Sequence, residues 1–259
     1  MNLQDKTESL LAESGSRYSA LCQGLNDDRP MININADEVF PSASIIKVPI
    51  LMTLFSKARL GELELEREID VCNILDDTQV FDGGPRKASL RELAVWMTVL
   101  SDNTSTNALI DILGFDAVNE YAASLGLKHT RLRRKMLDFA SRSAGIDNVT
   151  SAGDMFLLFR HLFGAARADL SEAISILRRQ RIGVNLVRYI WEDVALAHKT
   201  GDLDYLTHDA GVFSFNGYDV FTGVFLWDTA RIEGDSRLIG RIGRMVYDDF
   251  MCSRSRRPK

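Results

Sequence analysis

The chain has 259 residues, of which 46% are hydrophobic and 26% are charged, and its formal net charge at pH 7 is −5. This length and composition are typical of a globular protein with one compact domain or two closely packed subdomains. The acidic balance argues against nucleic-acid binding, because such surfaces need clustered lysine and arginine. The basic cluster at 254–259 is terminal, which is typical of a solvated tail.

The cysteines and the N-terminus indicate neither export nor a cofactor. The three cysteines, Cys22, Cys72 and Cys252, are far apart, and an odd, sparse count is typical of a reducing compartment. No cluster of His, Cys, Asp or Glu has metal-ligand spacing, and no apolar run is long enough for a signal peptide or a membrane span. We expect no metal, no cofactor, no membrane partner and a cytoplasmic location for the chain as written, with export of a longer precursor left open. We also expect a monomer.

The N-terminal quarter of the chain predicts a helix, a hairpin and a second helix. Residues 3–14 have an amphipathic helical pattern, and 17–35 have the pattern of two strands joined by a polar turn. A strongly apolar helix follows, from about Ser42 to Gly61. A small strand is expected at 69–73.

The middle of the chain predicts helices. Between residues 89 and 190 the apolar residues recur at spacings of three and four, as on the buried face of a helix. No strand pattern interrupts this stretch. The predicted helices are at 90–100, 104–113, 117–125, 151–162 and 170–177.

The C-terminal part of the chain returns to β-branched and aromatic runs. Strands are predicted at 194–199, 207–215 and 218–227, with a tight turn at Asn216-Gly217 between the last two. A last helix is predicted at 236–251.

Strands at both ends of the chain, around a helical middle, predict the fold class. It is α/β (α+β) in two layers: an antiparallel sheet flanked by terminal helices, plus an all-α subdomain inserted in the middle of the chain. We expect one catalytic domain over 1–259, divided into an α/β subdomain of 1–60 and 191–259 and an all-α subdomain of 61–190. A cleft between the two subdomains is the natural place for a site.

A serine and a lysine lie three residues apart in the most apolar segment of the chain, 40–55. Residues at i and i+3 share one face of a helix, so Ser44 and Lys47 would be neighbours. Burial lowers the pKa of a lysine, which suits a base that activates a serine nucleophile. The alternative is a solvated lysine beside a helix-capping serine.

Two further tripeptides would border the cleft. Ser101-Asp102-Asn103 lies between two predicted helices, and Lys199-Thr200-Gly201 ends a predicted strand. Together with Ser44-x-x-Lys47, they resemble the three motifs of class A β-lactamases and penicillin-binding proteins, in the same order. Local contexts such as Thr207-His208-Asp209-Ala210-Gly211 are similar too, so the resemblance covers most of the chain. It implies a β-lactamase/transpeptidase-like fold and acylation by a β-lactam or another activated amide or ester.

The resemblance implies catalytic roles for four residues. Ser44 would attack the carbonyl carbon of the substrate, with Lys47 as its proton acceptor or as the group that sets its electrostatics. Ser101 and Lys199 would carry the proton on toward the leaving nitrogen.

The resemblance also implies binding roles. Asn103 would hydrogen-bond the amide side chain of the substrate, and Lys199 with Thr200 would meet its carboxylate. Gly201 belongs to the same substrate-binding strand. The backbone N–H of Asp202, together with that of the nucleophile, would bind the oxyanion.

One feature of class A enzymes is missing. Their deacylating water is activated by a glutamate, but this chain has no glutamate between Glu120 and Glu172. In the corresponding loop, 131–150, the carboxylates are Asp138 and Asp147. Asp138 is either a substitute water-activating base or an ion-pair partner of its basic neighbours. We therefore expect slow deacylation.

The charge around the third motif also departs from the family pattern. Asp202 and Asp204 follow the motif, and 218–227 contains no lysine or arginine, which disfavours a carboxylate-bearing substrate and leaves room for another ester, amide or peptide. His198 and His208 either titrate near the site or are hydrogen-bonded in the sheet.

Three functions remain open for a chain of this pattern, all with a small-molecule ligand. The first is a serine hydrolase that turns over, and the second is a penicillin-binding or sensing domain that is acylated and releases slowly. The third is a non-catalytic relative that keeps only the fold. The missing glutamate favours the second, and the intact motifs disfavour the third.

Overall fold

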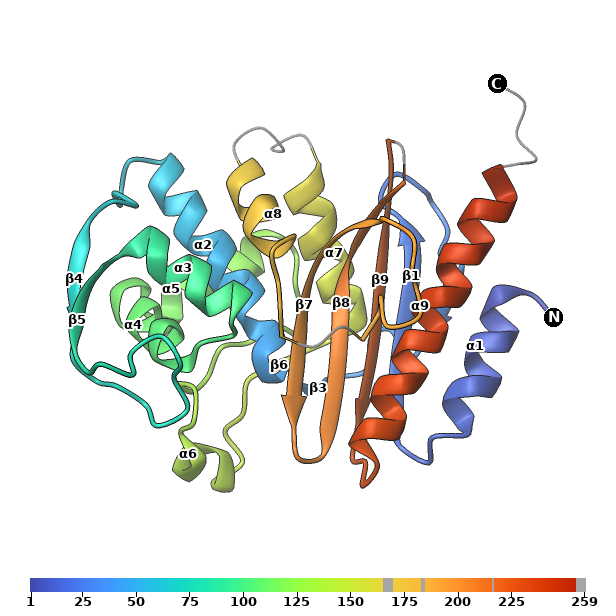
Figure 1. Cartoon of the computed structure of the whole chain (residues 1–259), viewed down its shortest axis with the longest axis horizontal. Helices are drawn as coiled ribbons and strands as arrows, with labels where there is room; N and C mark the ends of the chain where they lie inside the picture. Colours follow the sequence, from blue (N-terminus) through green and yellow to red (C-terminus); the bar gives the residue numbers. More distant parts are fainter. Residues whose placement is uncertain (165–169, 183–184, 216, 255–259) are drawn as a thin grey trace.

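The computed structural model describes residues 1–164, 170–182, 185–215 and 217–254. Its centre is an antiparallel sheet of five strands in the order β2-β1-β9-β8-β7 (Figure 1). Because β1 pairs with β9 along its whole length, the two ends of the chain form one sheet, as predicted. The strands are β1 (Arg17–Gly24), β2 (Ile32–Ile34), β7 (Ala195–Leu203), β8 (Leu206–Phe215) and β9 (Tyr218–Trp227).

The sheet is a middle layer, buried on both faces. On β8, Ala210 and Val212 pack in the larger hydrophobic core, whereas Phe213 and Phe215 pack in the smaller one. The side chains of a strand alternate between the two faces of its sheet, so a mostly apolar strand serves both cores.

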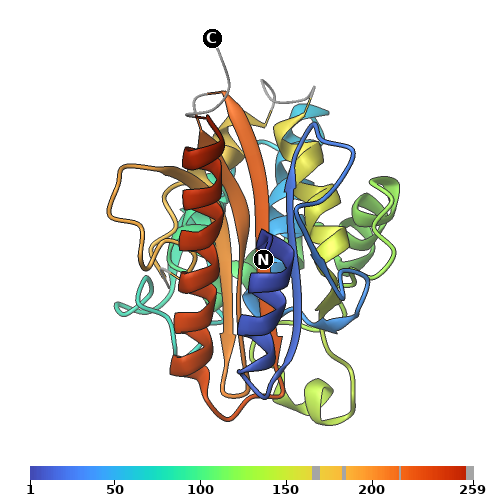
Figure 2. The ribbon, with the colours of Figure 1, turned by 90° about the vertical axis from the view of Figure 1, so that its right-hand side faces the viewer.

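Two helices from opposite ends of the chain cover one face of the sheet. They are α1 (Leu3–Ala12) and α9 (Ile232–Arg254), which pack against each other (Figure 2). Ile239, Ile242 and Val246 of α9 are fully buried, at the three- and four-residue spacing that places them on one side of the helix. These residues enclose the smaller core with β8 and β9.

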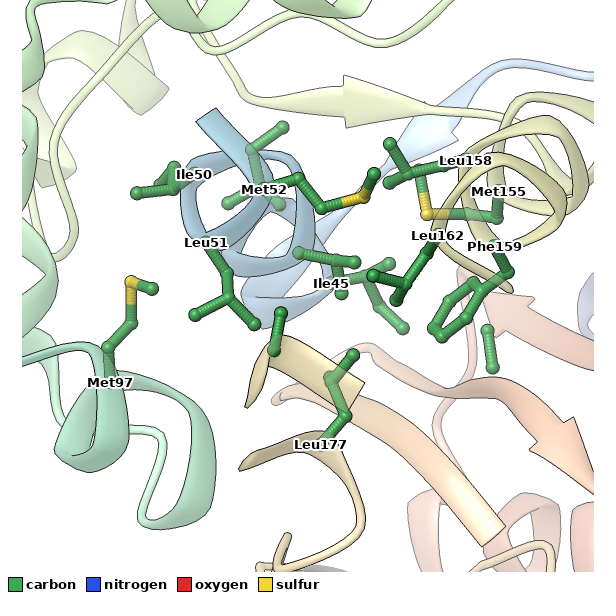
Figure 3. Packing of buried hydrophobic residues seen from close by; sticks show 14 of the residues in the cluster. Ile45, Ile50, Leu51, Met52, Met97, Met155, Leu158, Phe159, Leu162 and Leu177 are labelled. Atoms are coloured by element: carbon green, nitrogen blue, oxygen red, sulfur yellow. The ribbon is translucent and has the colours of Figure 1, made fainter. Parts of the chain in front are cut away.

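The helical part of the chain packs on the other face, around α2 (Lys47–Arg59). Nine consecutive residues of α2, Lys47–Phe55, are buried, because neighbouring helices and the sheet surround it. Figure 3 shows Met97 of α3 on one side of α2 and Leu158 of α7 on the other. The remaining helices are α3 (Leu90–Val99), α4 (Asn103–Leu113), α5 (Phe115–Ser124), α6 (Phe139–Ser143), α7 (Ala152–Phe163) and α8 (Ser171–Leu177).

Two small sheets and one short helix complete the structure, and the small strand predicted at 69–73 is found at 68–71. The strands β3 (Phe40–Pro41) and β6 (Val149–Thr150) pair with each other, as do β4 (Glu68–Val71) and β5 (Arg86–Ser89). The prediction that no strand interrupts 89–190 was wrong, because a strand of two residues has no alternation to detect. Helix α6 was also missed, since it has no buried residue and therefore no apolar face.

Some predictions fall outside the described residues: Asn216 of the predicted turn, the tail from residue 255 and the side chain of Cys252. The subdomain boundaries near residues 60 and 191 stay a prediction. Within the described ranges, no helix is both long and apolar enough to cross a membrane. No group of three or more His, Cys, Asp or Glu in the same ranges could hold a metal ion.

Candidate active site

The candidate nucleophile, Ser44, lies in a tight turn that joins a strand to the buried helix. The chain leaves β3, passes through a 3-10 turn, η1 (Ala43–Ile46), and continues into α2. Ala43 has a φ of +44°, in the left-handed region that a non-glycine residue rarely adopts. The backbone N–H of Ser42 donates to the carbonyl oxygen of Asn148 at 2.9 Å. The turn is therefore held from the neighbouring loop, with Ser44 half-buried.

Lys47 is buried at the start of α2, and its amine nitrogen lies among three oxygen atoms. Nζ is 2.6 Å from the carbonyl oxygen of Ser101, 3.0 Å from the Ser101 hydroxyl and 2.7 Å from Oδ1 of Asn103. Burial lowers the pKa of Lys47 well below its usual value, and the charge of nearby Lys199 lowers it further.

These partners suit both protonation states of Lys47. The Ser101 carbonyl and Asn103 Oδ1 only accept hydrogen bonds, whereas the Ser101 hydroxyl can also donate. An ammonium can donate to all three oxygens, and a neutral amine can donate to two and accept from the hydroxyl. The site can thus hold Lys47 as a base without leaving a buried polar atom unpaired. The alternative of a solvated lysine does not apply, since Lys47 is only 1% exposed.

Ser101 and Asp102 form the junction between α3 and α4. Ser101 has a φ of +55°, which turns both its carbonyl and its hydroxyl toward Lys47. Asp102 is the N-cap of α4 and accepts from the backbone N–H of Ser105 at 2.6 Å. Thr78 donates to the other oxygen of the same carboxylate. The aspartate of this motif therefore fixes the junction, and the serine and asparagine on either side of it reach the site.

Asn103 links Lys47 to a residue that no motif indicated. Its Oδ1 accepts from Lys47, and its Nδ2 donates to Oδ2 of Asp77 at 2.5 Å. Because both ends of the amide are bonded, the orientation of Asn103 is defined by its neighbours. Asp77 comes from the irregular segment after β4, where sequence patterns carry no signal.

Lys199 lies on β7, the edge strand of the sheet, and is fully buried. Burial lowers the pKa of Lys199 to about 8. Its Nζ donates to the carbonyl oxygen of Thr200 at 2.9 Å. Since its charge acts on Lys47, the two lysines lie close together, although 152 residues separate them in the sequence (199 − 47).

Thr200 points its hydroxyl at a segment that sequence reasoning did not single out. The hydroxyl donates to the carbonyl oxygen of Ile182 at 2.7 Å and accepts from Nε2 of Gln180 at 2.8 Å. Thr200 is only 1% exposed. Its hydroxyl is therefore already hydrogen-bonded, so it can bind a substrate carboxylate only if these partners rearrange.

Gly201 allows β7 to approach the turn that carries Ser44. A Cβ atom at this position would lie 3.1 Å from the carbonyl oxygen of Ser42 and 3.2 Å from the Cβ of Ala43. These separations are shorter than ordinary van der Waals contacts, so the edge of the sheet and the turn touch there. The next residue, Asp202, accepts a hydrogen bond from the Thr207 hydroxyl at 2.7 Å.

Three of the predicted site residues line one cavity of about 220 Å³. They are Ser44, Asn103 and Asp202; the buried Lys47 contacts Asn103, whereas Lys199 is not among the residues that line the cavity. A larger cavity, of about 700 Å³, is lined by residues such as Asn26 and Arg160 and contains none of the motif residues, so we place the site at the smaller one. The other residues that line the smaller cavity are Ala43, Asp77, Arg134, Met136, Leu137, Phe139, Arg142, Asn148 and Leu203.

Asp138 is the N-cap of α6. Its Oδ1 accepts from the backbone N–H of Ser141 at 3.0 Å, and its Oδ2 accepts from the Ser141 hydroxyl at 2.6 Å. These bonds lower the pKa of Asp138. The arrangement favours a structural role for Asp138 over a water-activating one. That role is helix capping, not the ion pair that the sequence suggested. In the described ranges the ion pair of Arg134 is with Asp147 instead, at 2.7 Å.

Both strand histidines are hydrogen-bonded in the sheet region. Nδ1 of His198 lies 2.7 Å from Oδ1 of Asp209, which is itself fully buried. The ring of His208 packs against Phe40 and Phe225. Burial lowers the pKa of His208 to about 4, so this ring is neutral at pH 7.

The fold is that of class A β-lactamases and their relatives. The chain belongs to the β-lactamase enzyme family, whose model matches residues 2–250.

Three comparisons with individual proteins agree with this membership. The chain is 25% identical to the β-lactamase regulatory protein BlaB of Streptomyces cacaoi, over 92% of this chain and 94% of that protein. It is similar in fold to a β-lactamase from Chitinophaga pinensis DSM 2588, with a TM-score of 0.89, 22% identity and 95% and 98% of the two chains covered. It is also similar to PBP-A, with a TM-score of 0.86, 26% identity and 96% of each chain covered. A mutant of PBP-A forms an acyl-enzyme complex with penicillin G.

Proposed function

We propose that this protein is an active-site-serine hydrolase in which Ser44 is acylated by a β-lactam or another activated amide or ester. The observation that carries the proposal is the buried Lys47, one helical turn from Ser44, whose burial and hydrogen-bond partners suit a neutral amine. A neutral lysine beside a serine hydroxyl is a base that can activate the serine.

The proposed path of the proton uses the contact between Lys47 and Ser101. As the Ser44 oxygen attacks the carbonyl carbon, its proton would pass to the lone pair of Lys47, which requires the Ser101 hydroxyl to turn away from that lone pair. The ammonium formed can then donate to its three oxygen partners. The Ser101 hydroxyl, 3.0 Å from Lys47, then gives its own proton to the leaving nitrogen and regains one from the ammonium. Lys199 adds positive charge beside Lys47, which keeps the pKa of Lys47 low and favours release of that proton.

The oxyanion would be bound by the backbone N–H groups of Ser44 and Asp202. The contact of Gly201 with the turn supports this assignment, because it brings the backbone of β7 against the backbone that carries the nucleophile. The two donors come from segments that are far apart in sequence and in direct contact in space.

We propose that deacylation is slow. The part of the cavity wall that comes from the 131–150 loop contains Met136 and Leu137, which cannot take a proton from water. Asp138, the nearest carboxylate in sequence, is engaged at the cap of α6. General-base activation typically contributes ~10²–10⁴ to a rate, so its loss lets the acyl-enzyme accumulate without preventing acylation.

The second candidate function is a penicillin-binding or sensing domain that is acylated and released without useful turnover. Its support is the similarity to BlaB, which is named as a regulatory protein, and the residues of the 131–150 loop that line the cavity, none of which is a carboxylate. The two candidates share the acylation step and differ in how fast the ester is hydrolysed.

One experiment tests the proposal and separates the candidates. The protein is incubated with a fluorescent penicillin and, separately, with a chromogenic cephalosporin, and its intact mass is then recorded. A stable mass increase with turnover of the cephalosporin supports a slow hydrolase, and a mass increase without turnover supports the binding domain. The control is Ser44→Ala, which should fold normally and remain unlabelled. Labelling of Ser44→Ala, or no labelling of the wild type, would contradict the proposal.

A further inference from the structure

The charged side chains on the wall of the active-site cavity are not equivalent. Two are arginines, Arg134 and Arg142, and two are aspartates, Asp77 and Asp202. Arg134 is only 8% exposed and is neutralised by Asp147, with contacts of 2.7 and 2.8 Å. It therefore has little capacity left for an anionic ligand.

Arg142 differs because no carboxylate in the described ranges lies within ion-pair distance of its guanidinium. The group lies over the ring of Tyr205, with 4.7 Å between its central carbon and the ring centroid. A guanidinium that stacks on an aromatic ring keeps N–H donors at its edge for a planar anion. Arg142 is thus the cavity's arginine with an available charge.

The opposite wall of the cavity offers few free hydrogen-bond donors to an anion. The Thr200 hydroxyl is engaged by Gln180 and Ile182, and Asp202 adds negative charge beside it. The described residues of β8 and β9 include no lysine or arginine. Lys199 of β7 is a cation too, but it is fully buried and donates to the Thr200 carbonyl, so Arg142 near α6 is the cation on the cavity wall that can meet a substrate carboxylate.

The loop that carries Arg142 is fixed in place. Asp138 caps the start of α6, and Arg134 pairs with Asp147 across the two ends of the loop. Asn148 accepts from the backbone N–H groups of Arg133 and Arg134 at 2.7 and 3.0 Å. The guanidinium is therefore positioned before the substrate arrives, which reduces the entropic cost of binding.

We infer that Arg142 binds a carboxylate on the part of the substrate that faces α6 in the cavity. The preferred acyl donors would then carry an anionic group on that part. This inference rests on the proposed function, because it concerns the selectivity of Ser44 acylation. It names Arg142 as a specificity-determining residue, in contact with substrate but with no part in the bond-making steps.

The test compares two penicillins that differ by one carboxylate on the side chain, benzylpenicillin and carbenicillin. The second-order rate constant of acylation is measured for the wild type, Arg142→Gln and Arg142→Lys. The control is Arg133→Gln, an exposed arginine of the same loop that does not line the cavity, so the change in net charge is identical. Circular dichroism and thermal unfolding establish that each variant is folded.

We expect wild type to react faster with carbenicillin than with benzylpenicillin. Arg142→Gln should slow carbenicillin by roughly 10- to 100-fold, the size expected for a lost charge-assisted hydrogen bond, and slow benzylpenicillin by no more than about threefold. Arg142→Lys should keep part of the preference, and Arg133→Gln should keep all of it. Equal slowing of both penicillins by Arg142→Gln, or no preference in the wild type, would overturn the inference about Arg142. Neither result would affect the proposal that Ser44 is acylated. If neither penicillin acylates the wild type, the proposed function fails and the inference fails with it.

Discussion

Nε2 of His208 lies 2.9 Å from the carbonyl oxygen of Pro41, across 167 positions of sequence. The contact joins the beginning of β8 to Pro41, the last residue of β3, just before the turn that carries Ser44. Nδ1 of the same ring lies 2.8 Å from the carbonyl oxygen of Thr207. A neutral imidazole has one N–H, so it donates to one of these two carbonyls, depending on the tautomer. In the Nε2–H tautomer the ring donates to the Pro41 carbonyl and positions the turn.

This relationship predicts a pH dependence of stability. The pKa of His208 is about 4 in the folded protein because the ring is buried, against about 6.5 for an exposed histidine. Between these values the unfolded chain binds the extra proton, so the free energy of unfolding falls as pH drops from about 6.5 to about 4, by up to about 3 kcal/mol. Urea unfolding at pH 5 and pH 7.5 measures this, and His208→Phe should weaken the dependence. The control His129→Phe should leave it unchanged; an equal effect of both variants would contradict the assignment.

The same contact predicts a kinetic effect. His208→Phe keeps an aromatic ring beside Phe40 and Phe225 but removes the bond to Pro41. The Ser44 turn should then be less well positioned, and we expect the acylation rate at saturating β-lactam to fall about tenfold with little change in the concentration needed for half saturation. His208→Gln, which retains a donor, should recover part of the loss. A change confined to binding would argue against a positioning role.

The two buried lysines predict a bell-shaped pH profile of acylation. The rate should rise as Lys47 loses its proton, which happens well below the usual lysine range because burial lowers its pKa. It should fall again above pH 8, because the pKa of Lys199 is about 8 and its charge is lost there. Lys199→Arg should move the alkaline limb to higher pH, since arginine keeps its charge. An unchanged alkaline limb in that variant would show that another group is responsible.

Deacylation should limit turnover of β-lactams in the wild type. We expect a burst of about one equivalent of product and then a slow steady phase, with an intact mass raised by one opened ligand. Asp138→Asn should leave the steady phase unchanged, because asparagine is an equally good N-cap and the carboxylate already serves Ser141. A steady phase slowed by about 100-fold in Asp138→Asn would instead identify Asp138 as the water-activating base. A fast linear turnover by the wild type would show that deacylation does not limit turnover.

A carboxylate placed on the apolar wall should speed deacylation. Leu137 is the better position, because it is half-buried and lines the cavity, whereas Met136 also packs in the hydrophobic core. We expect Leu137→Glu to raise the deacylation rate at least tenfold, since a glutamate there can accept a proton from water. Leu137→Gln has nearly the same size but no base and should have no such effect. Similar rates in the two variants would indicate a change of packing instead.

The sequence predicted most of the fold and the burial of Lys47. Lys47 was expected to be buried because its neighbours on both sides are apolar, and it is. The terminal strands were expected to share one sheet, and β1 pairs with β9. Both expectations depend on hydrophobic pattern, which is what a single sequence records well.

The rest of the site depends on long-range contacts between polar residues. Asp77, Gln180 and Arg142 lie in irregular segments or in a five-residue helix, and nothing in their local pattern indicates that they reach the motif residues. The role of Asp138 is a further case. Its basic neighbours suggested an ion pair, but its carboxylate caps α6, because a serine three residues later offers both a backbone N–H and a hydroxyl. That serine was a local signal that could have indicated the cap.

The contact at Gly201 has a consequence for how selectivity can change in this protein. A side chain at Gly201 would press on the Ser42 carbonyl oxygen at 3.1 Å and on the Ala43 Cβ at 3.2 Å, so it would require the turn that carries Ser44 to shift. On the side of the 131–150 loop the cavity is lined by side chains such as Arg142 and Leu137. New substrate preferences should therefore arise by substitution in the 131–150 loop, while residues 199–202 stay unaltered, so that one wall of the site is adaptable and the other is invariant.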